Sequence, residues 1–377
     1  MHLWPNLIKM ENWFQIKNID AVDSPALVVY PRRVKENIAL AVKMIGDIRG
    51  LRPHVKTHKC KEVAQLLLDA GVAKFKCATI AEAEMLAMAN APDVLLAYQL
   101  VGPKIDRFIK LIQSYPLTSF SCLVDDTVVA EQLNDAAHKA NIHLTVYIDL
   151  NVGMNRTGIS PKNAFTLYMK ILELTNLQFK GLHAYDGHIH DADFAIRKQQ
   201  SDTAFALVEQ VRKKIMAAHS TALDIVIGGS PTFSIHAKRE NVECSPGTFV
   251  YWDYSYGEKY EEQPFLPAAL VVSRIISLPE ENIICTDLGH KSIAAENPLS
   301  NRVHFINAPE LVFEGQSEEH LKLRAEKNHS YKIGDVLYGM PIHVCPTCAL
   351  YEKAIIVEEG IAGGEWRTIA RDRKIKI

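Results

Sequence analysis

The sequence predicts an α/β fold in which a (β/α)8 barrel of the TIM type is followed by a second, mostly β domain. From residue 24 to about 250, short apolar segments alternate with segments of helical periodicity, which indicates parallel strands joined by right-handed crossovers. After about Tyr251, apolar runs are separated by Gly, Pro, Asn and acidic residues, as expected of strands and turns. An open, doubly wound sheet is the structural alternative to the barrel.

The first part of the chain holds eight predicted strand–helix steps after an initial helix over 31–48, and eight such steps make one barrel. Strands are expected at 51–56, 74–78, 93–97, 120–124, 143–148, 179–183, 223–227 and 241–244. Helices are expected at 61–70, 80–90, 104–113, 126–140, 161–174, 193–219 and 232–238. The second part is expected to contribute strands at 271–277, 283–286, 336–340 and 354–358.

The composition gives no support for a nucleic-acid or membrane partner. Lys and Arg number 42 against 44 Asp and Glu, a formal net charge of −2. No apolar run approaches the roughly 20 residues that span a bilayer, and residues 1–23 lack the order of a secretory signal peptide. The seven cysteines are an odd number and mostly isolated, which favours a reducing, cytoplasmic location over a disulfide scaffold.

The segment Arg52-Pro53-His54-Val55-Lys56-Thr57-His58-Lys59 places a lysine at the end of a predicted strand, between histidines. Burial lowers the pKa of a lysine amine towards the range in which it is a nucleophile, although a basic, solvated strand end is the simpler explanation. The segment resembles the Pro-His-x-Lys-Thr-His motif of the D-threonine aldolase and D-serine dehydratase family. That family consists of pyridoxal phosphate (PLP) enzymes with the alanine racemase barrel. The resemblance implies that Lys56 binds PLP covalently.

A turn after the seventh predicted strand could hold a phosphate. In Gly228-Gly229-Ser230-Pro231-Thr232, two glycines permit close backbone approach to an anion, a helix start supplies free N–H groups, and Ser230 and Thr232 add hydroxyls. An ordinary turn with a helix cap is the alternative. The turn resembles the family's Gly-Gly-x-Pro-Thr segment, which implies that Gly228, Gly229, Ser230 and Thr232 bind the PLP phosphate.

Two further strand ends carry polar residues. The segment from Asp149 to Gly158 resembles the family's Asp-x-Gly-x-x-Arg-x-Gly pattern but has Asn151 where that pattern has Asp, and Arg156 could address the cofactor ring. His183 and Tyr185 alternate on one face of an extended segment, where Tyr185 could orient the cofactor. Farther on, Tyr254 lies in a block that resembles Pro-Gly-Thr-Tyr-Val-Phe-x-Asp and is a candidate for reaching the cofactor or substrate.

The sharpest metal candidate is the pair His343 and Cys345. In an extended chain, residues two apart face the same way, and imidazole with thiolate suits zinc. Cys348 leaves a Cys-x-x-Cys redox or structural zinc motif as an alternative. His-x-Cys followed by Pro-Thr resembles the metal motif of D-serine dehydratases, so a divalent metal (zinc or manganese) is expected there. Metal binding by His188, His190 and Asp186 is a weaker possibility.

The resemblance implies a PLP- and metal-dependent lyase that acts on D-β-hydroxy amino acids, as a D-threonine aldolase or as a D-serine or D-threonine dehydratase. Lys56 is then a candidate base for dehydration, and His54 or His183 for the aldol reaction. It also implies a barrel domain over 24–250, a metal-binding β-rich domain formed by 1–23 and 251–377, and a homodimer. An amino acid racemase, a non-catalytic PLP carrier and a PLP-free phosphate- or sugar-binding barrel are the alternatives.

Overall fold

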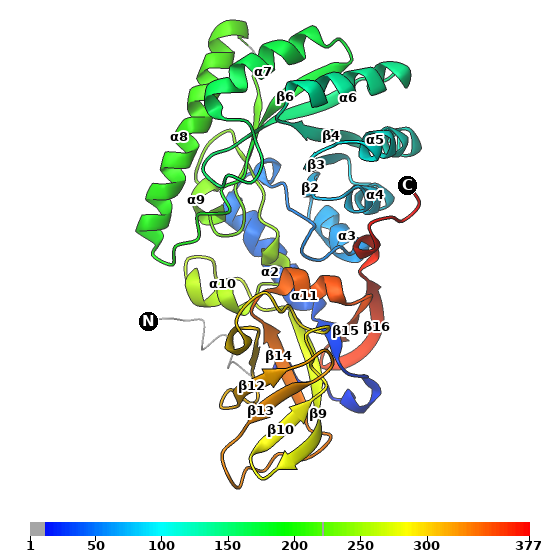
Figure 1. Ribbon diagram of the computed structural model, residues 1–377, viewed down its shortest axis with the longest axis vertical. Coiled ribbons are helices and arrows are strands. Elements are labelled where there is room, and N and C mark those ends of the chain that lie inside the picture. The colour runs from blue at the N-terminus through cyan, green and yellow to red at the C-terminus, as the bar shows by residue number, and fades with distance from the viewer. Residues whose placement is uncertain (1–11, 221) are drawn as a thin grey trace. The chain divides into compact units, whose positions relative to one another are not determined.

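The computed structural model describes residues 12–220 and 222–377, which fall into two compact units (Figure 1). The barrel unit comprises Ala41–Lys56, Ala64–Gly247 and Asp372–Ile377. The β-rich unit comprises the described residues up to Leu40, together with Thr57–Val63 and Thr248–Arg371. Of the segment 1–23 that we assigned to the β-rich domain, residues 1–11 lie outside the described residues.

Seven parallel strands form the sheet of the barrel unit, in the order of the sequence. They are β2 (Lys74–Cys77), β3 (Asp93–Gln99), β4 (Ser119–Val124), β5 (Leu144–Leu150), β6 (Leu177–Ala184), β7 (Asp224–Ile227) and β8 (Glu243–Cys244). Each one overlaps a predicted strand, so the alternation of apolar and helical segments was a reliable signal of parallel strands.

The segment 51–56 closes this sheet into a barrel, which excludes the open, doubly wound alternative. On one side Arg52 N–H donates to Cys244 O (2.9 Å), and on the other Val55 N–H donates to Lys76 O (2.9 Å) while Lys76 N–H donates to Pro53 O (2.8 Å). The predicted first strand is reduced to two isolated bridges, at Leu51 and His54. Pro53 has no N–H to donate, which interrupts the ladder.

Helices α4 to α8 lie outside the parallel strands (Figure 1). The helices up to β8 are α2 (Pro31–Ile45), α3 (Lys61–Asp69), α4 (Ile80–Met88), α5 (Pro103–Ser114), α6 (Thr127–Lys139), α7 (Pro161–Glu173), α8 (Phe194–His219) and the single turn α9 (Phe233–His236). Thr79, Asp126 and Asp193 accept backbone N–H groups at the starts of α4, α6 and α8. These side chains satisfy free donors of the first turn, which fixes where each helix begins.

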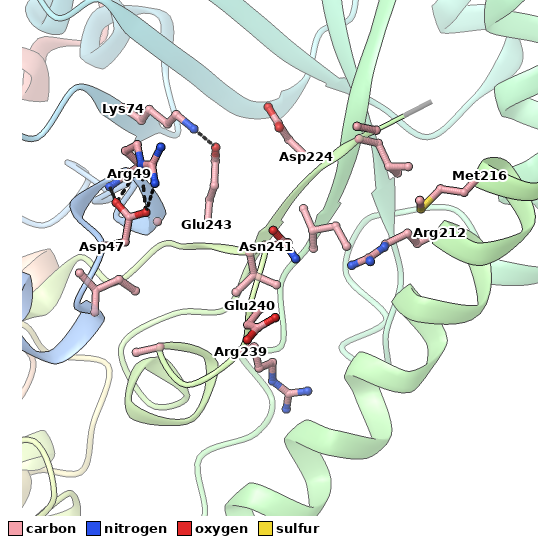
Figure 2. A pocket seen from close by; sticks show the side chains of 17 residues that line it. Asp47, Arg49, Lys74, Arg212, Met216, Asp224, Arg239, Glu240, Asn241 and Glu243 are labelled. Carbon is pink, nitrogen blue, oxygen red and sulfur yellow. Dashed lines mark hydrogen bonds and ion pairs between the residues drawn. The ribbon is translucent and has the colours of Figure 1, made fainter. Parts of the chain in front are cut away.

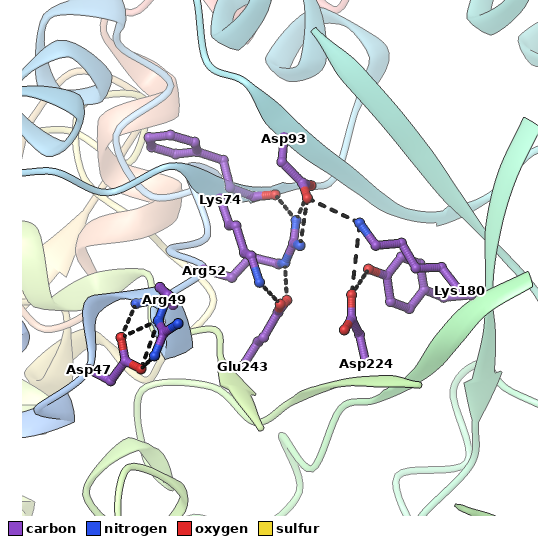
Figure 3. Close-up of polar contacts among 10 residues, drawn as sticks. Asp47, Arg49, Arg52, Lys74, Asp93, Lys180, Asp224 and Glu243 are labelled. Carbon is purple, nitrogen blue, oxygen red and sulfur yellow. Dashed lines mark hydrogen bonds and ion pairs between the residues drawn. The ribbon is translucent and has the colours of Figure 1, made fainter. Parts of the chain in front are cut away.

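The barrel interior is apolar at its middle and ionic at the amino ends of the strands. Leu95, Leu123, Tyr147 and Val226 pack together inside. Towards the amino ends of the strands, the fully buried guanidinium of Arg52 pairs with Asp93 and Glu243, at 2.6 Å each (Figure 3). Lys74 pairs with the same Glu243, and Lys180 with Asp93 and Asp224. Reciprocal pairing of this kind is what allows charges to be buried.

The β-rich unit is built on a nine-stranded sheet in the order β12-β13-β10-β9-β1-β15-β16, with β14 pairing with β9 and β11. Its strands are β1 (Ala26–Val29), β9 (Ala269–Glu280), β10 (Ile283–Thr286), β11 (Val303–Phe305), β12 (Val312–Gln316), β13 (Leu321–Arg324), β14 (Val336–Pro341), β15 (Lys353–Glu358) and β16 (Ile361–Arg367). The four predicted strands are present. Two short helices, α10 (Tyr254–Lys259) and α11 (Val344–Leu350), complete the unit.

The described part of the N-terminal segment bonds to this sheet without forming a strand before β1. Lys17 N–H donates to Gly360 O (2.7 Å), and Asn18 Nδ2 donates to Ala362 O (2.9 Å). Within residues 12–220 and 222–377, no helix combines the length and apolar character needed to cross a bilayer.

Candidate active site

Lys56 follows the last bridge of the closing segment, at the carboxyl end of the barrel. Its backbone N–H donates to Nδ1 of the buried His54 (3.2 Å), so His54 fixes the peptide that carries the lysine. The Lys56 side chain is half-buried and its Nζ lies 5.5 Å from the centroid of the Tyr185 ring. The structure therefore brings three predicted site residues, His54, Lys56 and Tyr185, to one end of the barrel.

The Tyr185 ring is surrounded by cations. Besides Lys56, the Arg156 guanidinium lies 4.8 Å from its centroid and the Lys76 amine 5.7 Å from it. Positive charges near an aromatic face are attracted by the ring quadrupole, and together they favour an anionic ligand. A hollow of about 10 Å³ beside the ring is lined by Asp149, Leu150, Asn151, Met154, Arg156, Thr157 and Tyr185.

The glycine turn after β7 lies against the same ring and has no room for side chains. A Cβ atom on Gly229 would be 3.0 Å from Tyr185 Cε2, and one on Gly228, where φ is +79°, would be 2.7 Å from His236 Cδ2. Only glycine permits both the left-handed backbone at Gly228 and this close approach. The bare backbone before a helix start is the kind of cradle that a phosphate group requires, so the residues present fit the PLP phosphate.

A buried carboxylate holds that turn in shape. Asp186 accepts a hydrogen bond from Thr232 Oγ1 (3.0 Å) and one from His236 Nε2 (2.8 Å). Ser230 Oγ accepts from Gly247 N–H (3.3 Å). The Thr232 hydroxyl proton is thus directed at Asp186, which makes Thr232 a support of the turn.

The loop that carries Arg156 is organised by Asn151. Its Oδ1 accepts the N–H groups of Gly153 and Asn155 (3.1 Å each), and its Nδ2 donates to Asn155 Oδ1 (2.9 Å). An aspartate could not make the last of these bonds, because a carboxylate only accepts. The departure from the family pattern at this position therefore has a local structural reason.

His183 is buried in a chain of three polar groups. Its Nδ1 lies 2.7 Å from Asp149 Oδ1, and its Nε2 lies 3.3 Å from the Nζ atom of Lys76. Burial, reinforced by the charge of Lys76, lowers the pKa of His183. Lys76 was not predicted as a site residue, although a lysine inside the predicted apolar strand 74–78 could have indicated a buried, functional amine.

The metal candidates lie in the β-rich unit, at the start of α11. His343 is the N-cap residue of this helix and Cys345 is in its first turn, so the predicted extended geometry was wrong, yet the two side chains still contact each other. His343 Nδ1 bonds to Glu296 Oε1 (2.6 Å), and Thr57 Oγ1 lies 3.1 Å from Cys345 Sγ. Thr57 directly follows Lys56 in the chain.

The donor set suits a metal ion in part. Metal-binding histidines usually give their other ring nitrogen to a carboxylate, as His343 does to Glu296. Burial lowers the pKa of His343, but Cys345, Asp253 and Glu296 outweigh it and raise the pKa to about 9, and surroundings that favour a proton also favour a metal cation. Residues 12–220 and 222–377 hold no group of three or more His, Cys, Asp or Glu arranged around one point, so the site offers two protein ligands.

Tyr254 also belongs to the β-rich unit. Its ring stacks on His304, with centroids 4.4 Å apart and planes 21° apart. The preceding residue, Asp253, caps α10 and accepts Val344 N–H at the start of α11 (3.2 Å). The predicted candidate is thus held by stacking beside the helix that carries Cys345.

A cavity of about 870 Å³ lies at the amino ends of the barrel strands, away from Lys56. Figure 2 shows Lys74, Asp224 and Glu243 among its lining side chains, and these residues begin β2, β7 and β8. The ligand sites of such barrels lie at the carboxyl ends of the strands. We therefore place the candidate active site at Lys56 and Tyr185.

Comparisons with known proteins identify the family and its relatives. The family model described as "Alanine racemase, N-terminal domain" matches residues 29–255, more than half of the chain, and a model of a serine dehydratase domain matches 268–357. The D-threonine aldolase of an Arthrobacter species is 26% identical over 361 residues, 93% of each chain. The 3-hydroxy-D-aspartate aldolase of Paracoccus denitrificans (strain Pd 1222) is 25% identical over 370 residues, also 93% of each chain.

A solved structure shares the whole architecture. The crystal structure of D-threonine aldolase from Filomicrobium marinum matches with a TM-score of 0.86 at 25% identity and covers 95% of this chain and 98% of that one. The comparison thus extends over both units, and not only over the barrel.

Proposed function

Because the chain belongs to the family of the alanine racemase N-terminal domain, we propose that it is a PLP-dependent lyase that acts on D-β-hydroxy amino acids. The observation that carries this proposal is the meeting of Lys56, the Tyr185 ring and the glycine turn at one end of the barrel. Relatives of nearly full length that are named D-threonine aldolase and 3-hydroxy-D-aspartate aldolase support the lyase reaction and the D-hydroxy substrate class.

Each barrel residue has a distinct part in holding the cofactor. Lys56 would bond PLP covalently, Tyr185 and Arg156 would contact its ring and oxygen atoms, and Gly228, Gly229 and Ser230 would bind its phosphate, with Thr232 shaping the turn. Bound PLP would draw electrons from the Cα atom of the substrate and so weaken the bonds to that atom. His54 would keep the Lys56 peptide in place, and Lys56 Nζ could accept or return a proton when it is not bonded to PLP.

A divalent metal on His343 and Cys345 is the second part of the proposal. Such a metal would act as a Lewis acid on the substrate β-hydroxyl. Two protein ligands leave coordination positions for water and substrate, and open positions indicate a catalytic metal site more than a structural one. Within the β-rich unit, Cys345 contacts Thr57, which directly follows Lys56 in the chain.

Aldol cleavage is the reaction that we favour, and dehydration is the second candidate. Cleavage of the Cα–Cβ bond is favoured by the two aldolase relatives, which each span 93% of the chain. Dehydration is favoured by the serine dehydratase domain match over 268–357, which contains both His343 and Cys345.

Product analysis with D-threonine tests these reactions, in the presence of PLP and zinc or manganese. Glycine and acetaldehyde would identify an aldolase, and 2-oxobutanoate with ammonia a dehydratase. Conversion to the L-configured epimer would identify a racemase. A protein that shows the visible absorbance of bound PLP, lost in Lys56→Ala, but exchanges no Cα proton would be a PLP carrier. A wild-type protein without that absorbance, after PLP is added, would refute the proposal.

We further propose that the protein is a cytoplasmic homodimer. All seven cysteines are free, as in a reducing compartment. Sedimentation equilibrium of the full chain would show a mass of twice 42.2 kDa, and a monomer at micromolar concentration would contradict the dimer.

A further inference from the structure

Lys76 is a second lysine at the proposed PLP site, and it is almost completely buried, with 2% of its surface exposed. It lies on β2, and its backbone bonds to Pro53 and Val55 place it beside the segment that ends in Lys56. His54 and Lys76 are bridge partners, and Lys56 lies in the turn two residues farther along. The amines of Lys56 and Lys76 lie 5.5 Å and 5.7 Å from the centroid of the same Tyr185 ring, so both reach the carboxyl end of the barrel interior.

The hydrogen bonds of His183 have a defined direction that involves Lys76. Asp149 is an acceptor, so the proton of a neutral His183 ring resides on Nδ1, which lies 2.7 Å from the carboxylate. His183 Nε2 then carries the lone pair and accepts from Lys76 Nζ at 3.3 Å. The hydrogen bond from Lys76 therefore engages Nε2, the atom through which His183 would otherwise accept a proton as a base.

Charged groups surround Lys76 from several elements. Lys56 and Arg52 from the closing segment oppose its positive charge, while Asp149 on β5 and Asp186 after β6 favour it. The centroid of the Tyr185 ring lies 5.7 Å from this amine and 4.8 Å from the Arg156 guanidinium. Burial, followed by the charge of Lys56, lowers the pKa of Lys76 from 10.5 to about 7, in spite of the two carboxylates.

We infer that Lys76 is a positioning residue of the proposed PLP site: it holds the His183 ring through Nε2, and its proton supplies a positive charge beside Lys56 and Arg156. This inference rests on the proposed function only in taking PLP as the ligand. An anionic ring ligand should bind more tightly while Lys76 is protonated, on the order of tenfold for one partly screened charge. His183, with both nitrogens engaged, then serves to orient Lys76.

The affinity for pyridoxine 5′-phosphate tests the charge, because this probe resembles PLP but has no aldehyde to bond Lys56. Calorimetric titration of the full, PLP-free chain would be run from pH 6 to pH 9. In the wild type, affinity should be constant below about pH 7, fall about tenfold over roughly the next pH unit, and then level. Lys76→Met should bind about tenfold more weakly at pH 6. The ratio of the two proteins cancels the titration of the probe itself.

Two variants make the test specific. Lys76→Arg, charged at every pH used, should keep the tighter binding up to pH 9. Lys74→Met, on the same strand but paired with Glu243 at the opposite end, should retain the wild-type pH dependence. In nitrogen-15 spectra of histidine-labelled protein, the Nε2 signal of His183, assigned with His183→Asn, should move in Lys76→Met and stay unmoved in Lys74→Met.

The outcomes separate the two proposals. The same pH dependence in the wild type and in Lys76→Met, or an unmoved His183 signal, would overturn the role of Lys76 and leave the PLP site intact. Failure of the wild type to bind the probe at any pH would overturn the PLP site, and the role of Lys76 with it.

Discussion

Replacement of Asp186 by alanine tests whether a buried carboxylate holds the phosphate turn. Asp186 is 1% exposed and accepts from Thr232 Oγ1 and His236 Nε2, which are themselves buried. Hydrogen bonds to a charged group contribute about 1.5–3 kcal/mol each, so the loss of two should lower the free energy of unfolding by about 3–6 kcal/mol. The freed turn should also bind PLP at least tenfold more weakly, since its backbone N–H groups are no longer fixed.

Urea unfolding of the PLP-free protein and fluorescence titration with PLP measure the two effects of Asp186→Ala separately. Asp202→Ala is the matched control, because Asp202 also pairs with cations, Lys198 and Arg239, but is 45% exposed. An exposed pair is worth at most about 1 kcal/mol, so the control should keep nearly full stability and unchanged PLP affinity. An Asp186→Ala protein that matches the control in both assays would refute our account of the turn.

Three further predictions concern the buried charges and the metal. Arg52→Met should lower the free energy of unfolding by about 3–5 kcal/mol, because Asp93 and Glu243 each lose their fully buried partner and keep only Lys180 and Lys74; a loss under 1 kcal/mol in urea titrations would contradict this. Between pH 7 and pH 10.5 the wild type should gain up to roughly 4 kcal/mol relative to Lys76→Met, because the unfolded chain still holds a proton that the folded Lys76 has released; melting curves of the two proteins with the same pH dependence would contradict this. His343→Ala and Cys345→Ala should each lower the zinc retained after dialysis, measured by mass spectrometry, and full retention in both would exclude the pair as ligands.

The sequence predicted the barrel well because its signal is repeated. Seven apolar segments with helical segments between them leave few topologies, and β2 to β8 all lie where the alternation placed them. The closing segment 51–56 was less predictable in detail, since the effect of Pro53 on its ladder depends on which side of the strand faces β2. In the β-rich unit, β11, β12, β13 and β16 were missed because they are short or alternate with charged residues.

The motifs of the candidate site could be predicted from the sequence, but the residues that surround them in space could not. Lys56, Tyr185 and the glycine turn were nominated from strand ends, where a barrel collects them. Lys76 was not, because alternation puts Lys74 and Lys76 on the same face of the strand and does not reveal which of them reaches the ligand end of the barrel. The geometry around Cys345 was mistaken because an extended chain was assumed from His343 to Cys345, whereas Pro346 is compatible with the first turn of a helix, here α11.

The peptide bond between Lys56 and Thr57 gives this molecule a short mechanical linkage. Consecutive Cα atoms stay about 3.8 Å apart, so a displacement of one residue also displaces the next. The Thr57 hydroxyl touches the Cys345 sulfur, and a change in what that sulfur binds must shift the Thr57 side chain or break the contact. Loss of the metal should therefore perturb the visible spectrum of PLP on Lys56 even in the absence of substrate. The spectrum would be recorded before and after chelation in the wild type and in Thr57→Val, which lacks the hydroxyl that contacts Cys345. A change in the wild type alone would show that the absorbance of the cofactor reports on the metal site.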